Sequence, residues 1–311
     1  MRRLIIGAII ISGLGMVACE NTQRKQQETT STRQEEKKRT FQLPEVPVML
    51  NNPELRGSYV AQHYWDHFDF QDTIYIHLPE ITEQAAVNFM DLLQRIPQEE
   101  ALASLKRLTE QAVTEPVMMN YFWETLSKYW HDPNSPMKNE EMFILLCKSV
   151  EQTEKVEEYL RGRAAYERIL AEKNRVDMKA ADIVYTLASG KQDRLYELKA
   201  PYTLVFFYNP DCHTCADIKQ AMHHSLLLKD LVSSRQMKVL TIYPDEDVNL
   251  WREHLDEMSD EWINGYDKGQ ILTMEEKYDL SSIPSFYLLD KDKKVLLKDA
   301  DWVQVLQFLE N

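Results

Sequence analysis

The sequence lacks the short motifs that mark several common enzyme classes. It has no glycine-rich phosphate-binding loop, no His-Glu-x-x-His pair and no serine nucleophile elbow. Positive charge is also in short supply, since 36 Lys and Arg face 50 Asp and Glu, for a formal net charge of −14. An acidic chain of this kind is a poor match for a nucleic-acid-binding protein.

Cysteine is scarce as well, with four in 311 residues. Cys147 lies in a strongly apolar helical stretch, where a buried thiol is favoured over a redox partner. Cys212 and Cys215 form a single Cys-x-x-Cys motif, and Cys19 stands near the start of the chain. With 44% hydrophobic residues, the chain is long enough for two compact domains.

Residues 1–19 are predicted to be an export signal. Two arginines are followed by an uncharged run, 4–18, that is shorter than the ~20 residues needed to span a bilayer. The small residues before Cys19 resemble the end of a bacterial lipoprotein signal, which implies cleavage before Cys19 and lipid on that cysteine. We therefore expect an exported protein that is anchored in the cell envelope and faces the periplasm or the cell surface. An uncleaved anchor and a plain signal peptide are the alternatives.

The next two segments differ sharply in composition. Residues 20–42 are rich in Gln, Thr, Glu, Lys and Arg, and such a segment is predicted to be a flexible tether. Residues 43–173 show helical spacing of apolar residues and are predicted to form a bundle of four or more helices. The helices are expected at 83–96, after Pro97, at 116–130 and at 139–172, the last with a candidate break at Gly162.

Three histidines in this half, His63, His67 and His77, invite a metal or catalytic interpretation. They do not form a fixed ligand constellation, so we expect the aromatic-rich stretch 64–70 beside them to pack against the bundle.

In the second half, residues 182–187 and 194–198 flank a Ser-Gly turn and predict a β-hairpin. The charged run 290–294 lacks the glycine and distal glutamate of a calcium loop and is predicted to be a hairpin turn.

The Cys-x-x-Cys motif has the surroundings of a redox site. The β-branched and aromatic run 202–208 predicts a buried strand, Asn-Pro-Asp breaks it, and 216–228 has helical periodicity. Cys212 is therefore expected at a helix N-terminus, where backbone N–H groups favour a thiolate. Cys215, one turn further in, can resolve a mixed disulfide.

Two other interpretations of the motif stay open. It can be a structural disulfide, or half of a zinc site. Zinc needs four ligands, usually from two paired motifs, and here only His223 or His224 could complete a site with the single Cys-x-x-Cys motif. A surface or packing role suits both histidines better, because they occupy helical positions beside apolar residues.

Residues 174–311 resemble the thioredoxin superfamily, in particular the membrane-tethered thiol–disulfide oxidoreductases of the cytochrome-maturation type, which are related to peroxiredoxins. The resemblance rests on Cys212-His213-Thr214-Cys215, the strand 237–243 and Ile283-Pro284-Ser285. It implies a three-layer α/β/α fold that needs neither cofactor nor metal. It also implies a cis Pro284 facing the cysteines, and an Ile283 backbone that pairs with the incoming substrate. Residues 56–69 resemble the helical N-terminal domain, of undefined function, of exported thioredoxin-like lipoproteins.

Several positions depart from the family pattern. Asp211 replaces the usual Trp, and His213 and Thr214 replace Gly-Pro, so these two are expected to tune the redox poise, with His213 making the disulfide more oxidising. Phe206 stands where many thioredoxins carry a buried Asp, which leaves Asp245 and Glu246 as candidate proton acceptors for Cys215. A peroxidase is disfavoured, because Asn209 occupies the position of the peroxiredoxin threonine.

The sequence thus predicts a helical domain followed by a thioredoxin-like α/β domain, in an exported, lipid-anchored thiol–disulfide oxidoreductase. Its partners are expected to be extracytoplasmic thiol or disulfide proteins together with a redox donor or acceptor protein, and not nucleic acid. The alternative is a binding lipoprotein without catalysis, in which the thioredoxin-like fold is a scaffold. The direction of electron flow depends on a reduction potential that no residue pattern supplies.

Overall fold

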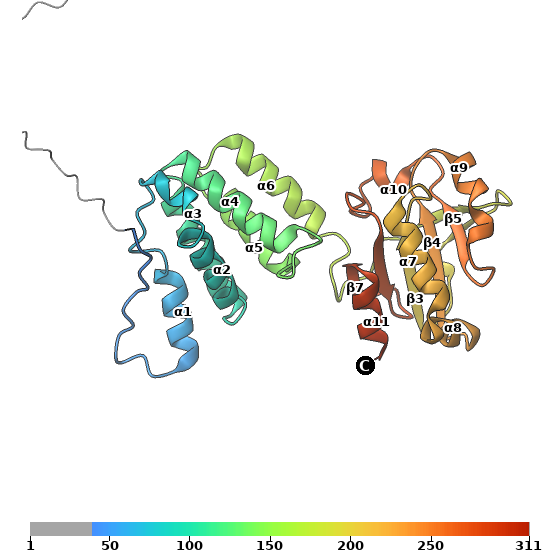
Figure 1. Cartoon of the computed structure of the whole chain (residues 1–311), viewed down its shortest axis with the longest axis horizontal. Helices are drawn as coiled ribbons and strands as arrows, with labels where there is room; N and C mark the ends of the chain where they lie inside the picture. Colours follow the sequence, from blue (N-terminus) through green and yellow to red (C-terminus); the bar gives the residue numbers. More distant parts are fainter. Residues whose placement is uncertain (1–38, 311) are drawn as a thin grey trace, which may run out of the picture. The chain divides into compact units, whose positions relative to one another are not determined.

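Two kinds of structure follow one another along the computed structural model, which describes residues 39–310. Helices occupy the first part, and a seven-stranded sheet with flanking helices occupies the second (Figure 1). This order confirms the predicted fold class. Cys19, the rest of the predicted signal and most of the predicted tether lie outside the described residues.

Local sequence signals explain where the helices of the first part begin. Proline stands in the first turn of α1 and α4, where its missing N–H costs no hydrogen bond, and the Asn139 side chain caps α5. The elements are α1 Pro53–His63, η1 Thr73–His77, α2 Thr82–Leu93, α3 Gln98–Ala112, α4 Pro116–His131, α5 Glu140–Glu151 and α6 Glu158–Ala171.

The helix prediction fails at two places. The region predicted as one helix, 139–172, is two helices, α5 and α6, separated at 152–157, while Gly162 lies inside α6 without a break. Helix α1 has no predicted counterpart, because it buries little more than Ser58 and Ala61 and so shows no apolar stripe. Helical periodicity can reveal only the helices that bury a continuous face.

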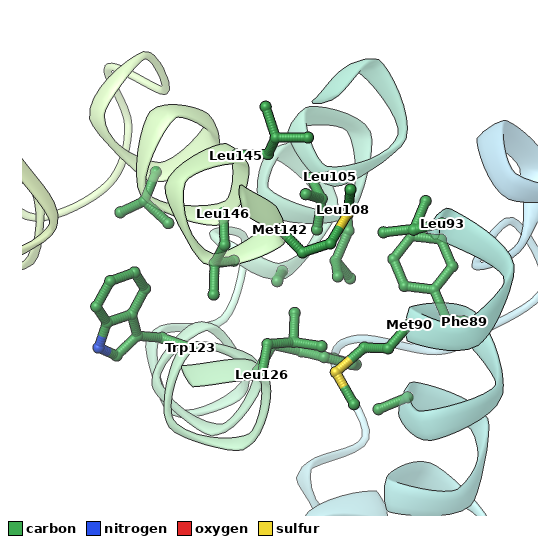
Figure 2. Packing of buried hydrophobic residues seen from close by; sticks show 14 of the residues in the cluster. Phe89, Met90, Leu93, Leu105, Leu108, Trp123, Leu126, Met142, Leu145 and Leu146 are labelled. Carbon is green, nitrogen blue, oxygen red and sulfur yellow. The ribbon is translucent and has the colours of Figure 1, made fainter. Parts of the chain in front are cut away.

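Aromatic and aliphatic side chains fill the interior of the helical part, with residues of α2, α3, α4 and α5 meeting there (Figure 2). The aromatic stretch 64–70 packs against this core as predicted, with turns in its backbone: the Trp65 ring lies 4.8 Å from that of Phe122 and 5.7 Å from that of Phe89. His63 contacts Asp66 at 2.7 Å. Across residues 39–310, no group of His, Cys, Asp and Glu side chains is arranged to hold a metal ion.

A mixed sheet forms the centre of the second part. Its strand order is β2-β1-β5-β4-β3-β6-β7, with β3, β4 and β5 parallel and the other pairs antiparallel. The strands are β1 Val184–Leu187, β2 Gln192–Arg194, β3 Tyr202–Phe207, β4 Met237–Tyr243, β5 Ile263–Tyr266, β6 Ser285–Leu289 and β7 Val295–Ala300. The central strand β3 is buried from Thr203 onward, as its apolar run predicts.

Both faces of the sheet are covered, which gives three layers. One face carries α7 His213–His224, α8 Leu226–Ser233, α9 Val248–Glu253 and α11 Trp302–Glu310. The other packs against α10 Ile271–Met274 and the segment 180–198. Most of the predicted second hairpin strand, 194–198, is the 3-10 turn η2 Leu195–Glu197. The predicted turn at 290–294 is confirmed, because the Asp290 side chain accepts two backbone N–H groups within it.

Ion pairs and hydrogen bonds connect the helical part to the sheet part within residues 40–310, which belong to one compact unit. Lys138 contacts Asp299 at 2.7 Å, and Lys298 contacts Glu140 at 2.7 Å. Asn174 donates a hydrogen bond to the Lys277 carbonyl. No helix in the described range is long and apolar enough to cross a membrane.

Two glycines provide a matched test of the packing. A Cβ on Gly265 in β5 would lie 2.8 Å from Cδ2 of the buried Tyr185, whereas a Cβ on Gly162 in α6 meets nothing within 4 Å. We expect Gly265→Ala to lower the free energy of unfolding by about 1–3 kcal/mol through overpacking. Gly162→Ala should raise it by about 0.5–1 kcal/mol, because alanine favours the helix. Urea denaturation measures both, and equal effects of the two substitutions would contradict the packing of β5 on Tyr185.

Candidate dithiol site at the start of helix α7

The turn between β3 and α7 places Cys212 at the N-terminus of the helix. The Cys212 N–H donates to the Asn209 carbonyl at 3.1 Å, and the Asn209 side chain accepts the Asp211 N–H at 2.9 Å. These bonds fold the Asn-Pro-Asp sequence into a tight turn and leave Cys212 as the N-cap residue of α7. The helix starts at His213, so Cys212 lies at its N-terminus as predicted, and the predicted stretch 216–228 is divided at Ser225 between α7 and α8.

The Cys212 sulfur takes the role that an oxygen plays at most helix starts. Its Sγ accepts the backbone N–H of Cys215 at 3.2 Å, which satisfies one of the unpaired donors of the first turn. A helix N-terminus stabilises an anionic group by about 0.3–1 kcal/mol, and by up to ~2 kcal/mol where it is partly buried. The Cys212 sulfur is half-buried and lies beside the free amides of the first helical turn.

Cys215 is a different kind of thiol. Its side chain is 2% exposed, and both cysteines are free thiols. Burial, and to a smaller extent the neighbouring Cys212, raise the pKa of Cys215 to about 12. One sulfur is thus accessible and next to helix amides, and the other is shielded and protonated one turn deeper.

Phe206 belongs to the buried hydrophobic cluster that also contains Cys215. Its ring is fully buried and stacks on Phe286 with centroids 4.6 Å apart, and on Tyr208 at 5.5 Å. Of the two candidate proton acceptors, Asp245 accepts a hydrogen bond from the Asn209 amide at 2.6 Å, and Glu246 is exposed. The contact of Asp245 therefore supports the turn before Cys212.

The loop with Pro284 comes directly before β6, at the same end of the sheet as the turn that carries Cys212. The Ile283–Pro284 peptide is cis, as the resemblance implies, and Ser285, the next residue, pairs with Phe207 at the end of β3. Pro284, Ile283 and Thr214 line one cavity of about 630 Å³. The structure thus brings the motif and the proline loop, far apart in sequence, to one site.

The remaining candidates lie around this centre. His213 and Thr214 are both exposed, so each can meet an incoming molecule. His223 stacks on Trp262 with centroids 4.7 Å apart and contacts the Glu257 carbonyl, which is the packing role expected for it. The His224 ring contacts the Gln220 carbonyl within its own helix.

Sequence reasoning missed one polar residue of the site, Asp299. Its carboxylate accepts a hydrogen bond from Ser285 Oγ at 2.8 Å, directly after the cis proline, and it also lines the cavity. Asp299 has a φ of 47°, a left-handed conformation at an irregular part of the β6–β7 ladder. In the sequence, Asp299 is an ordinary residue near the end of an edge strand, and nothing around it predicts its contact with Ser285 or its left-handed backbone.

Two family models match the chain. Residues 18–174 match one described as a domain of unknown function, DUF5106, and residues 201–295 match one described as thioredoxin-like. No match is found among curated proteins.

Solved structures from Bacteroides species are similar to the chain. A thioredoxin-like protein from Bacteroides caccae ATCC 43185 is 40% identical, with a TM-score of 0.78 over 88% of this chain and 98% of that one. The C-terminal domain of an uncharacterized protein from Bacteroides fragilis NCTC 9343 is 43% identical, with a TM-score of 0.44 over 44% of this chain and 99% of that one. The thioredoxin domain of a thiol-disulfide oxidoreductase from Bacteroides vulgatus is 19% identical, with a TM-score of 0.37 over 43% and 98%. The chain therefore belongs to the DUF5106 family, and its second part is a thioredoxin-like domain.

Proposed function

We propose that the protein is a thiol–disulfide oxidoreductase that exchanges disulfides with other exported proteins through Cys212 and Cys215. One observation carries the proposal: a half-buried sulfur at the N-terminus of α7 accepts a helix N–H, and a second, buried thiol follows one turn later. A structural disulfide does not require that one of its cysteines be more exposed than the other. The difference is what a nucleophile and a resolving thiol require.

The chemistry proceeds in two exchanges when the protein acts as a reductant. The Cys212 thiolate attacks a partner disulfide, so that a Cys212–partner S–S bond forms, the partner S–S bond breaks and the released thiolate takes up a proton. Cys215 then loses its proton and attacks Cys212 Sγ, which forms the Cys212–Cys215 bond and releases the second partner thiol. Two electrons pass to the partner, and the reverse sequence oxidises a dithiol.

The surrounding residues have supporting roles in the proposal. His213 and Thr214 flank the reactive sulfur and are exposed, which suits residues that set the redox poise. A protonated His213 adds positive charge beside the thiolate and so favours the reduced form. Ile283 and Pro284 line the cavity beside Thr214, where the Ile283 backbone can pair with a partner chain.

A second candidate function is binding without catalysis, with the thioredoxin-like fold as scaffold. It is favoured by the apolar stack of Phe206, which puts an aromatic ring where a proton acceptor for Cys215 is expected. An exchange assay separates the two, because a scaffold does not turn over.

We further propose that the protein is exported and lipid-anchored through Cys19, on the basis of the sequence of residues 1–19. Metabolic labelling of bacteria that express the full chain with a fatty-acid analogue is expected to mark the protein. Cys19→Ala should abolish the label and move the protein from the membrane to the soluble fraction, while Cys147→Ala leaves both unchanged. Labelling that persists in Cys19→Ala would disprove the anchor.

The exchange activity is tested with cysteine variants and a disulfide-bonded protein substrate in a defined redox buffer. Cys212→Ser is expected to lose exchange entirely, because the attacking sulfur is gone. Cys215→Ser should react once and stop at the mixed disulfide. Cys147→Ala, which alters a fully buried cysteine in α5, is the matched control and should keep the wild-type rate. Undiminished exchange in Cys212→Ser would contradict the proposal.

The pH dependence of the same assay identifies the resolving step. Because burial raises the pKa of Cys215 above that of an ordinary thiol, its thiolate fraction should rise steadily with pH between pH 7 and 9, and release of the partner should accelerate in step. The release rate is measured from a mixed disulfide formed beforehand. A plateau in this range would mean that another group takes the Cys215 proton.

A further inference from the structure

The cavity that Thr214 of the Cys-x-x-Cys motif lines has a second wall, which comes from the helical domain. Thr214, Ile283 and Pro284 line one side, and residues of the loop between α4 and α5 line the other. The loop residues that face the cavity are Pro133, Asn134, Ser135, Pro136 and Lys138. The volume of about 630 Å³ lies within the range of ligand-binding clefts.

A hydrogen-bonded chain connects this loop to the cis-proline loop. Lys138 Nζ contacts the Asp299 carboxylate at 2.7 Å and the Asp299 carbonyl at 3.1 Å. The other carboxylate oxygen of Asp299 accepts the Ser285 hydroxyl at 2.8 Å, next to Pro284. Lys138 and Asp299 side chains are each 23% exposed, so water screens the pair less than it would a surface pair.

A second contact holds the two domains together beside the first. The Lys298 side chain is only 5% exposed, and its Nζ contacts the Glu140 carboxylate and the Ala171 carbonyl, each at 2.7 Å. A buried lysine persists only where such partners are fixed. The helical domain is therefore attached at the strand that supplies Asp299 to the cavity.

The loop itself is held in shape. The Asp132 side chain accepts the Asn134 N–H at 2.8 Å, and the Ser135 hydroxyl donates to the Tyr129 carbonyl at 2.6 Å. Two prolines, Pro133 and Pro136, further restrict the backbone. Asn134 and Pro136 remain exposed, so the loop presents a preformed rim at the cavity.

We propose that the α4–α5 loop of the DUF5106 domain is a specificity wall, which selects an extended cysteine-bearing polypeptide segment with neutral or basic residues around the cysteine. This inference rests on the proposed exchange function. The cavity lining contains Asp299 and Asp301 but a single lysine, Lys138, which pairs with Asp299, so one negative charge is left over, and the whole chain carries a charge of −14. Acidic segments are therefore disfavoured. Cys212 is only half-buried and does not line the cavity, so we expect a small disulfide to reach it without touching the loop.

The test compares two substrates with the same leaving group, thionitrobenzoate. One is an eight-residue peptide with a central cysteine flanked by lysines, and the other is the mercaptoethanol mixed disulfide. Asn134→Trp fills the rim of the cavity, whereas Val117→Trp places the same residue on an exposed site at the other end of α4, about 20 Å along the helix. The full-length protein is used, and release of thionitrobenzoate is followed by absorbance.

We expect Asn134→Trp to lower the second-order rate constant for the peptide at least fivefold and to change that for the small disulfide less than twofold. Val117→Trp should leave both rate constants unchanged. The wild-type protein should prefer the lysine-flanked peptide over a glutamate-flanked one, and added salt should reduce this preference. The proposal is overturned if Asn134→Trp slows both substrates equally or neither. If the wild-type protein reacts with neither substrate, the proposed exchange function fails first.

Discussion

The hydrogen bond from the Cys215 N–H to the Cys212 sulfur is the contact on which the account of this protein depends. It exists because the buried strand β3 ends in a tight turn that delivers Cys212 to the exact start of α7. The same geometry fixes the difference between the two thiols: one stands at the open end of the helix, and the other is buried one turn inside, in the same hydrophobic cluster as Phe206. The proposed roles of nucleophile and resolving thiol both rest on that single arrangement.

The helical domain contacts the same site. Asp299 is shared between the two domains: it accepts the Ser285 hydroxyl beside the cis proline and pairs with Lys138 from the helical domain. Its left-handed backbone at the irregular end of β7 is a conformation that proteins keep where geometry matters to function. In the proposed function, a rim built from a second domain gives the thioredoxin-like site a selectivity beyond that of its own two loops.

Local patterns predicted the parts of the structure that have local causes. The apolar run of β3, the break at Pro210 and the Cys-x-x-Cys spacing sufficed to place Cys212 at a helix start, because each follows from neighbouring residues. Helix α1 and the separation of α5 from α6 were missed, since the first buries almost no apolar face and the second is a turn without glycine or proline. Asp299 and Lys138 could not be paired from sequence, because 161 positions separate them.

The reduction potential of the Cys212–Cys215 couple tests the central claim most directly. Purified protein is equilibrated with glutathione buffers of graded potential, and mass spectrometry then measures the fraction in which these two cysteines are bonded. An exchange site should interconvert reversibly, with a midpoint between about −270 and −120 mV, the range of characterised exchange proteins. A midpoint below about −300 mV, or no bond between these cysteines at any potential, would show a structural disulfide or an inert pair and would contradict the account.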